Sequence, residues 1–197
     1  LEAAHALELG EDGLALEESR DLFELGSLAN LVRERKNGDL GFYNVNTHIN
    51  PTNVCVYTCD FCAFRADLDE PKAYVMYRDQ ITERARQASE RGATEIHIVG
   101  GLHHKLKLDY YMDVIRWIKE VDPEIHVKAY TAVEIEFFAK ITRVSTEEVL
   151  KRLVEAGLNS LPGGGAEIFH PEVREKVCGA KATTEQWLDV HRTAHRL

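Results

Sequence analysis

Residues 81–101, "ITERARQASERGATEIHIVGG", place a helical pattern directly before a strand pattern. The helix is expected to stop at Gly92, because glycine readily adopts the backbone conformation that ends a helix. The run "TEIHIV" then predicts a short strand, which the paired glycines Gly100 and Gly101 bring to an end. A helix that leads into a strand in this way is part of a βαβ arrangement.

The same alternation continues on both sides of this stretch. We expect, in chain order, a helix over 21–39, an extended run over 41–49, the helix and strand of 81–101, a helix over 110–122, a strand over 124–134, a helix over 145–157, a short strand over 158–165 and a helix from 183 onward. Ser145 with Glu148 three residues later predicts a capping box, and Thr184 or its neighbour is expected to cap the last helix. Strands that alternate with helices predict a parallel sheet with right-handed crossovers.

Four strands and a leading helix amount to about half of an eight-fold α/β barrel, which typically takes about 250 residues. The predicted fold class is therefore α/β, a partial (βα) barrel with parallel strands inside and helices outside. We expect two regions, an N-terminal helical segment over 1–40 and a partial barrel of four βα units over 41–197.

Composition narrows the classes of function. The 197 residues are 44% hydrophobic and carry a net charge of −9. No apolar run approaches the roughly 20 residues of a membrane span, and the start of the sequence lacks the features of a signal peptide, so we expect a cytoplasmic protein without a membrane partner. No basic tract is dense enough to follow a phosphate backbone, which argues against nucleic acid as a partner.

Unusual residues gather at the carboxyl ends of the predicted strands. They are the cysteine-containing segment 50–65, the pair Gly100 and Gly101, Glu134, and the segment 163–167 with its three glycines. In parallel α/β folds the ligand lies outside the carboxyl ends of the strands. Four loops are therefore expected to form one site.

Three cysteines in "NPTNVCVYTCDFCAFR" (50–65) favour metal ligation or redox chemistry over crosslinking. A structural zinc ion normally takes four protein ligands, and the nearest fourth candidates are histidines (His48, His103 and His104). Iron–sulfur clusters are held by thiolates at short spacings, so three cysteines on a four-iron cluster leave one iron open for chemistry. The fourth cysteine, Cys178, stands far from the others and is expected to be a packing residue.

The pattern Cys-x-x-x-Cys-x-x-Cys, with the aromatic Phe61 before the last cysteine, resembles the radical S-adenosylmethionine (SAM) superfamily. The resemblance implies a 4Fe–4S cluster on Cys55, Cys59 and Cys62, with SAM bound to the open iron as a co-substrate. Gly100 and Gly101 match the family's Gly-Gly turn, which lets backbone approach the methionine end of SAM. Reductive cleavage of SAM then yields methionine and a 5′-deoxyadenosyl radical, and an electron donor such as flavodoxin or ferredoxin is implied.

Five blocks look like the aminofutalosine synthases of the futalosine route to menaquinone: "HINPTNVCVYTCDFCAF", "EIHIVGGLH", "KAYTAVEI", "SLPGGGAEIF" and "WLDVHRTAH". That family adds the adenosyl radical to the vinyl ether of 3-[(1-carboxyvinyl)oxy]benzoate, here called enolpyruvyl benzoate. His104 departs from the pattern, which has proline there, and the family's C-terminal half is not matched. The alternatives are a sibling enzyme, either dehypoxanthine futalosine cyclase or a deazaflavin chromophore synthase, and a non-catalytic metal-binding half-domain.

Several polar residues are candidates for a role in the site, and some of them also have a structural alternative. Glu134 would contact SAM at the end of the third strand, or it would be an acid in the first turn of a following helix. Lys128 and Tyr130 share the parity of Glu134 along that strand, which makes them candidates to bind substrate inside the barrel. His48 would contact substrate or hold the cysteine loop, and His97 is interpreted as a core histidine.

Overall fold

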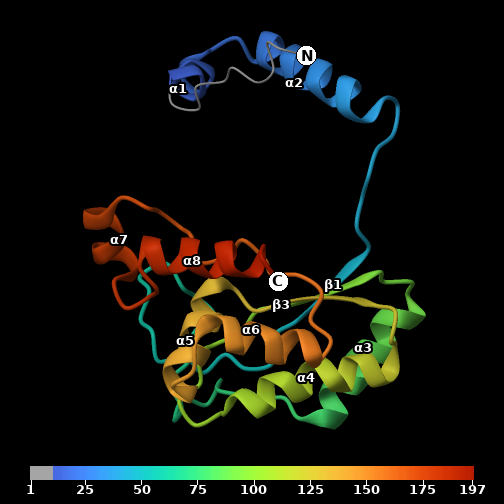
Figure 1. Cartoon of the computed structure of the whole chain (residues 1–197), viewed down its shortest axis with the longest axis vertical. Helices are drawn as coiled ribbons and strands as arrows, with labels where there is room; N and C mark the ends of the chain where they lie inside the picture. The colour runs from blue at the N-terminus through green and yellow to red at the C-terminus, as the bar shows by residue number, and fades with distance from the viewer. Residues whose placement is uncertain (1–10) are drawn as a thin grey trace. The chain divides into compact units, whose positions relative to one another are not determined.

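The computed structural model describes residues 11–197, which form two compact units that divide after Tyr43. The elements, in chain order, are α1 (Glu11–Glu18), α2 (Leu22–Asn37), β1 (Asn46–Ile49), α3 (Arg78–Glu90), β2 (Glu95–Ile98), α4 (Leu108–Val121), β3 (His126–Ala129), α5 (Ala132–Thr142), α6 (Thr146–Glu155), α7 (Pro171–Cys178) and α8 (Thr184–Ala194) (Figure 1).

The first unit contains α1 and α2. The helix expected over 21–39 is confirmed as α2, and the Asp21 carboxylate starts it by accepting hydrogen bonds from the N–H groups of Phe23 at 3.1 Å and Glu24 at 3.0 Å. No residue of α2 is buried, so its apolar side chains are not covered within the described chain. The first ten residues of the predicted segment 1–40 lie outside the described residues.

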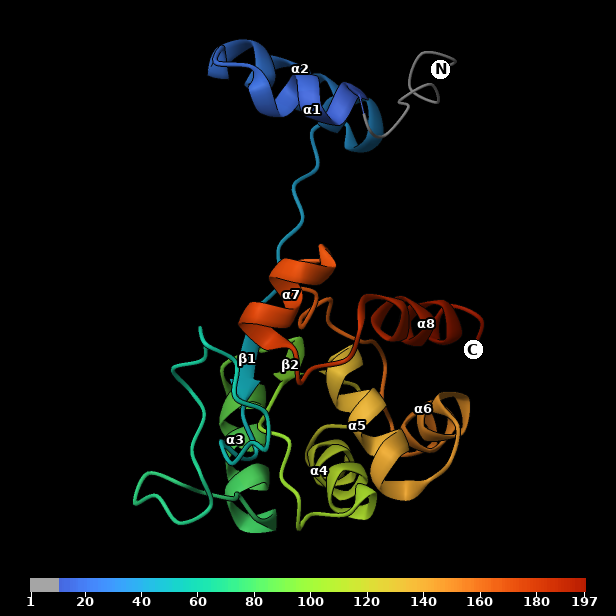
Figure 2. The same ribbon diagram turned by 90° about the vertical axis from the view of Figure 1, so that its left-hand side faces the viewer.

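The second unit is built on a parallel sheet with the strand order β1-β2-β3. The register places His48 beside His97 and His97 beside Lys128. Each strand is followed by a helix, and α3, α4, α5 and α6 succeed one another around the outside of the sheet (Figures 1 and 2). This confirms the parallel α/β architecture that the alternating pattern predicts.

The two faces of the sheet differ in chemistry. The apolar side chains of β2 and β3 have no exposed surface and pack in the core beneath the helices: Ile96, Ile98, Val127 and Ala129. Burying an isoleucine of this kind stabilises the fold by about 1.5–3 kcal/mol. The alternate residues Glu95, His97 and Lys128 lie on the opposite face, since successive side chains of a strand point to opposite sides. The inner face of the partial barrel is therefore polar.

The third predicted strand, 124–134, is too long at its carboxyl end. β3 stops at Ala129, Tyr130 takes a left-handed conformation with φ 63°, and Thr131 caps helix α5. Sequence reasoning missed α5 because its first seven residues are all buried, and a short apolar run does not distinguish a strand from a buried helix. Glu134 therefore lies in the first turn of α5 and does not end a strand.

The fourth predicted strand, 158–165, is reduced to one parallel bridge between Lys128 and Ser160. The N–H of Asn159 donates to the carbonyl of Val127 at 3.0 Å, but Pro162 and the glycines after it do not continue the ladder. Three of the four expected βα units thus have a regular strand. The difference follows from the residues themselves, since proline lacks an N–H and glycine has no side chain to pack.

The residues predicted to cap helices α6 and α8 do so, but the predicted capping box at Ser145 does not form. Ser145 caps α6, but the carboxylate of Glu148 pairs with Arg152 at 2.8 Å, so the reciprocal bond of a capping box does not form. Thr183, the neighbour of Thr184, caps α8 and makes a full capping box with Gln186. Helix α7 had no predicted counterpart. Among residues 11–197, no helix combines the length and apolarity needed to cross a bilayer.

Candidate active site

A cavity of about 550 Å³ opens at the carboxyl ends of the strands. Its lining comes from all four expected loops: Cys55, Tyr57, Cys59, Phe61, Cys62, Phe64 and Arg65 from the first, Val99, Gly100, Gly101 and Leu102 from the second, Thr131, Val133 and Glu134 from the third, and Pro162 to Gly165 with Glu167 from the fourth. Asn50, His97 and Lys181 complete the wall. The predicted meeting of the loops is confirmed.

Backbone hydrogen bonds hold the cysteine loop in shape. The N–H of Cys55 donates to the carbonyl of Ala66 at 3.2 Å, and the N–H of Cys62 donates to that of Cys59 at 3.1 Å, which forms a tight turn. The N–H of Asp60 reaches the carbonyl of Val177 in α7 at 3.1 Å. The loop is therefore fixed at both flanks, while its cysteines face the cavity.

The three cysteines fit a cluster better than a single ion. All of them are free, and in the described part of the chain no three cysteine, histidine or acidic side chains are gathered to hold one metal ion. The zinc alternative therefore has no fourth ligand in place. A four-iron cluster takes each thiolate on a different iron, so its cysteines need not converge on one point. Burial raises the pKa of the Cys59 thiol, with Lys181 opposing the shift, so metal binding there would release a proton.

The paired glycines serve the packing of the cysteine loop. A Cβ on Gly101 would lie 2.2 Å from the carbonyl oxygen of Val54, and the Gly101 N–H donates to the carbonyl of Thr52 at 2.8 Å. A Cβ on Gly100 would lie 3.2 Å from the Thr52 oxygen. The close approach that the sequence assigns to SAM is thus already made by the chain's own backbone, and only glycine fits at 101.

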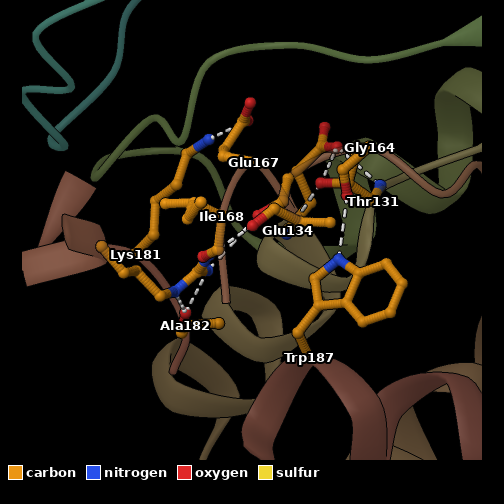
Figure 3. Close-up of polar contacts among 11 residues, drawn as sticks. Thr131, Glu134, Gly164, Glu167, Ile168, Lys181, Ala182 and Trp187 are labelled. Atoms are coloured by element: carbon orange, nitrogen blue, oxygen red, sulfur yellow. Dashed lines mark hydrogen bonds and ion pairs between the residues drawn. The ribbon is translucent and has the colours of Figure 1, made fainter. Parts of the chain in front are cut away.

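Glu134 joins the second and third loops. Its Oε1 accepts a hydrogen bond from the N–H of Gly100 at 3.0 Å, and its Oε2 accepts from the N–H and hydroxyl of Thr131 at 2.7 and 2.9 Å (Figure 3). Burial raises the pKa of this carboxyl to about 7, although all three donors favour the charged form. The first-turn position of Glu134 in α5 is confirmed. Glu134 also lines the cavity, and its contact with SAM stays a prediction.

The raised pKa of Glu134 makes the stability of the fold pH dependent. A carboxyl with a pKa near 7 in the folded state and 4.5 otherwise contributes stability that is present below pH 4.5 and lost as pH rises through 7. Glu134→Gln removes this titration. The wild-type free energy of unfolding, relative to the variant, is expected to be about 2–3 kcal/mol larger at about pH 5 than at about pH 8, measured by urea denaturation. An equal difference at both pH values would show a carboxyl of ordinary pKa.

The Lys181 side chain contacts both the cysteine loop and Glu167, which follows the glycine-rich loop. Its ammonium pairs with Glu167 at 2.7 Å (Figure 3). The same ammonium lies 5.1 Å from the ring centroid of Phe61, the aromatic residue of the cysteine motif. Sequence reasoning missed Lys181, because nothing in its local sequence points to a partner so far along the chain. The cation–π contact and the ion pair together cover one side of the cavity.

Arg174 of α7 anchors the glycine-rich loop. Its guanidinium is buried and donates to the carbonyls of Gly165 at 3.3 Å, Ile168 at 3.0 Å and Ala182 at 3.0 Å, and also to that of Ala166. Within residues 11–197 no carboxylate pairs with it. On the other side of the loop, the indole N–H of Trp187 in α8 donates to the carbonyl of Gly164 at 3.1 Å (Figure 3). The loop is thus held by two helices.

Arg174→Met is expected to lower the free energy of unfolding by roughly 3–5 kcal/mol, because four carbonyls lose the buried guanidinium that bonds to them. Arg116→Met is the matched control, since Arg116 is exposed and bonds only to Asp113 at 2.9 Å, and its loss is expected to be under about 1 kcal/mol. Denaturation in guanidinium chloride measures both. Equal losses in the two variants would contradict the anchoring role.

The three residues expected to bind substrate lie outside the cavity wall. Tyr130 is fully buried and its hydroxyl donates to the carbonyl of Tyr111 at 2.7 Å, because the left-handed backbone at 130 breaks the alternation of β3 and turns the side chain into the core. Lys128 does lie on the inner face, but it pairs with Glu95 at 2.7 Å. His48 bonds to His97, which lines the cavity although the sequence suggested a core position.

Comparison with known proteins shows the superfamily to which the chain belongs. Residues 49–197 match the family model of the radical SAM superfamily, and the chain belongs to that superfamily. Its members use a 4Fe–4S cluster and SAM. The residues present fit this pair of cofactors, since the three cysteines and the Gly-Gly turn line one cavity.

The more similar relatives fall into two groups. The chain is 46% identical to the aminodeoxyfutalosine synthase of Thermus thermophilus, over 95% of this chain and 50% of the relative, and 45% identical to that of Streptomyces coelicolor, over 94% and 48%. It is 41% identical to the 5-amino-6-(D-ribitylamino)uracil–L-tyrosine 4-hydroxyphenyl transferase of Methanopyrus kandleri, over 93% and 50%. The chain thus spans about half the length of these relatives.

Solved structures share the fold. Methylornithine synthase has a TM-score of 0.68 at 18% identity, over 91% of this chain and 49% of that structure. HydG, a maturase of the FeFe-hydrogenase, has a TM-score of 0.67 at 18% identity, over 92% and 39%. The predicted fold class is confirmed.

Proposed function

We propose that the chain forms the cluster and SAM site of an enzyme that adds the 5′-deoxyadenosyl group to enolpyruvyl benzoate. The adduct loses the carboxylate of its enolpyruvyl part as carbon dioxide. The product is aminofutalosine, the aminodeoxyfutalosine of the relatives' name, and the pathway is menaquinone biosynthesis. The observation that carries the proposal is the single cavity lined by the cysteine loop, the Gly-Gly turn, Glu134 and the glycine-rich loop. The 46% and 45% identity to two aminodeoxyfutalosine synthases supports the choice of substrate.

The residues of this chain have distinct roles in the proposal. Cys55, Cys59 and Cys62 would hold a 4Fe–4S cluster with one iron left open, and Phe61 lines the same cavity. When bound, the cluster and SAM supply the adenosyl radical. Gly100, Gly101 and Glu134 shape the part of the wall that receives SAM.

The chain's contribution to the reaction is positioning and the exclusion of water. The cavity wall carries apolar side chains, among them Val99, Leu102 and Val133, which offer no acidic or basic group to a reactive intermediate. Holding the vinyl group beside the adenosyl carbon makes the addition effectively unimolecular. Lys128 and Tyr130 are left out of the substrate contacts, because an ion pair and the core occupy them.

The proposal also includes an electron donor and a cellular compartment. A small one-electron carrier such as flavodoxin or ferredoxin supplies the reducing electron. The three free thiols suit the reducing conditions of the cytoplasm, where cysteines remain available for metal binding.

A sibling reaction is the second candidate, favoured by the 41% identity to the 4-hydroxyphenyl transferase. The experiment offers the reconstituted, reduced protein and SAM either enolpyruvyl benzoate, or 5-amino-6-(D-ribitylamino)uracil with tyrosine, in separate anaerobic reactions. Mass spectrometry is expected to find aminofutalosine in the first reaction and no coupled product in the second. Coupling in the second reaction alone would replace the proposed function by the sibling one.

A further inference from the structure

Lys181 carries a positive charge into the cavity that the proposed function leaves without a role. The Lys181 side chain lines the cavity and is 14% exposed. Its Nζ lies 5.1 Å from the ring centroid of Phe61, which stands between Cys59 and Cys62 in the cysteine motif. The ammonium therefore lies beside the cysteine loop, although Lys181 belongs to the segment between α7 and α8.

The charge of Lys181 acts on groups from two other loops. Of the charges that act on the Cys59 thiol, Lys181 has the largest effect, and it opposes the rise in the pKa of that thiol that burial causes. Lys181 also opposes the rise in the pKa of Glu134. Its ammonium thus favours negative charge at the cavity wall, and on Cys59 in particular.

An ion pair with Glu167 fixes the position of the ammonium. The Lys181 Nζ lies 2.7 Å from the Glu167 carboxylate, and Figure 3 shows the Lys181 side chain extended toward it. The Glu167 side chain is 33% exposed, against 14% for Lys181. Water screens the more exposed charge more strongly, so Glu167 only partly offsets the field of the ammonium in the cavity.

Arg65 is the other side chain of the cavity wall with a permanent positive charge in the described part of the chain. Its guanidinium pairs with Asp67, and its Nε donates to the carbonyl of Cys55 at 3.1 Å, so Arg65 belongs to the hydrogen bonding of the cysteine loop. Among residues 11–197, the Lys181 ammonium makes no hydrogen bond to that loop. The charge of Lys181 can therefore be removed without breaking a hydrogen bond of the loop.

Reduction of a 4Fe–4S cluster on three thiolates adds a negative charge to a group that is already anionic. The reduction potential of such clusters depends on net charge, hydrogen bonds to the sulfurs and solvent exposure. At an effective dielectric constant of about 20, one unit charge changes an equilibrium about tenfold from about 12 Å away. A cation beside the cysteine loop therefore affects reduction without touching the cluster.

We propose that Lys181 sets the reduction potential of the cluster site, because its ammonium stabilises the reduced, more negative cluster and so makes reduction by a one-electron carrier easier. One electron passes from the carrier to the cluster, and no atom is transferred in this step. The inference rests on the proposed function in one respect, the 4Fe–4S cluster on Cys55, Cys59 and Cys62. It does not depend on the identity of the substrate.

The test is a redox titration of the anaerobically reconstituted protein without SAM, followed by electron paramagnetic resonance of the reduced cluster. The proteins are the wild type, Lys181→Met, Lys181→Arg and Glu167→Gln. Lys176→Met is the matched control, because Lys176 is exposed in the last turn of α7 and does not line the cavity. Iron content and the melting temperature are recorded for every variant.

In Lys181→Met the ratio of reduced to oxidised cluster at a fixed potential is expected to fall about tenfold, a midpoint potential lower by about 59 mV. Lys181→Arg keeps the charge and is expected to stay within about twofold of the wild-type ratio. Glu167→Gln leaves the ammonium uncompensated and is expected to raise the potential. Lys176→Met is expected to leave it unchanged, and all variants are expected to keep wild-type iron content.

An unchanged potential in Lys181→Met, or an equal shift in Lys176→Met, would overturn the inference. Loss of iron in Lys181→Met would also overturn it, because Lys181 would then hold the loop in shape and not act through its charge. A wild type that takes up no cluster would instead contradict the proposed function, and with it this role of Lys181.

Discussion

Cys59→Ala is expected to bind iron poorly and to lose all measurable cleavage of SAM. In the proposed assignment Cys59 is the middle ligand of the loop. Its side chain is half-buried at the cavity wall, and its removal would leave two thiolates for a cluster held by three. The variant is expected to retain the fold, because the backbone bonds of the loop do not use the Cys59 side chain. Iron analysis after anaerobic reconstitution, with mass spectrometry of 5′-deoxyadenosine, measures both losses.

Cys178→Ala is the matched control for this prediction. Cys178 is buried at the end of α7, next to Val177, whose carbonyl accepts the Asp60 N–H of the cysteine loop, so it lies nearer to the other cysteines than its place in the sequence suggests. It does not line the cavity, and packing stays its predicted role. The control is expected to keep its iron and its SAM cleavage and to lose only about 1 kcal/mol of stability. Equal iron loss in the two variants, or none in Cys59→Ala, would contradict the assignment of ligands.

Gly101→Ala is expected to destabilise the fold and to disturb the cysteine loop at the same time. The added Cβ would lie 2.2 Å from the Val54 oxygen and 2.6 Å from the Val54 carbonyl carbon, which are backbone atoms of the cysteine loop. The loop must shift or the hydrogen bond to Thr52 must break, and the expected cost is about 3 kcal/mol. Since the shift moves Cys55, the iron content is expected to fall as well.

Gly100→Ala provides a graded comparison at the adjacent position. Its Cβ would lie 3.2 Å from the Thr52 oxygen, a tight contact that a small adjustment relieves, and the N–H to Glu134 is retained. We expect less than half the stability loss of Gly101→Ala, measured by chemical denaturation, and near wild-type iron content. A larger effect at 100 than at 101 would show that approach to the cofactor, and not to the chain's own loop, explains the paired glycines.

The sequence predicts the parts of the fold that periodicity and glycine govern. The helices α2, α3, α4, α6 and α8 and the three strands follow from local pattern, and the meeting of their loops follows from the rule that parallel strands end on one edge. Helix α5 was missed because its first seven residues, Glu134 and Glu136 included, are all buried, so no exposed face marks it as a helix. The orientation of Tyr130 depends on a left-handed φ that an aromatic residue seldom adopts, and no pattern signals it.

Site residues that belong to a local sequence motif could be predicted. Site residues that depend on the meeting of distant segments could not. The cysteine loop, the paired glycines and Glu134 all line the cavity as expected. Lys181 lines the cavity and Arg174 bonds to the carbonyl of Gly165 in its wall only because the residues after 165 fold back, which depends on tertiary packing. The inner face of β2 did have a signal: Ile96 and Ile98 point to the core, so His97 between them must point inward.

The central claim is that the three cysteines hold a cluster whose open iron receives SAM, and electron paramagnetic resonance tests it directly. The anaerobically reconstituted protein is reduced with dithionite and its spectrum is recorded with and without SAM. The account predicts about four irons per chain, a reduced-cluster signal, and a change in that signal when SAM is added. Stoichiometric zinc without a cluster, or a cluster signal that SAM leaves unchanged, would contradict it.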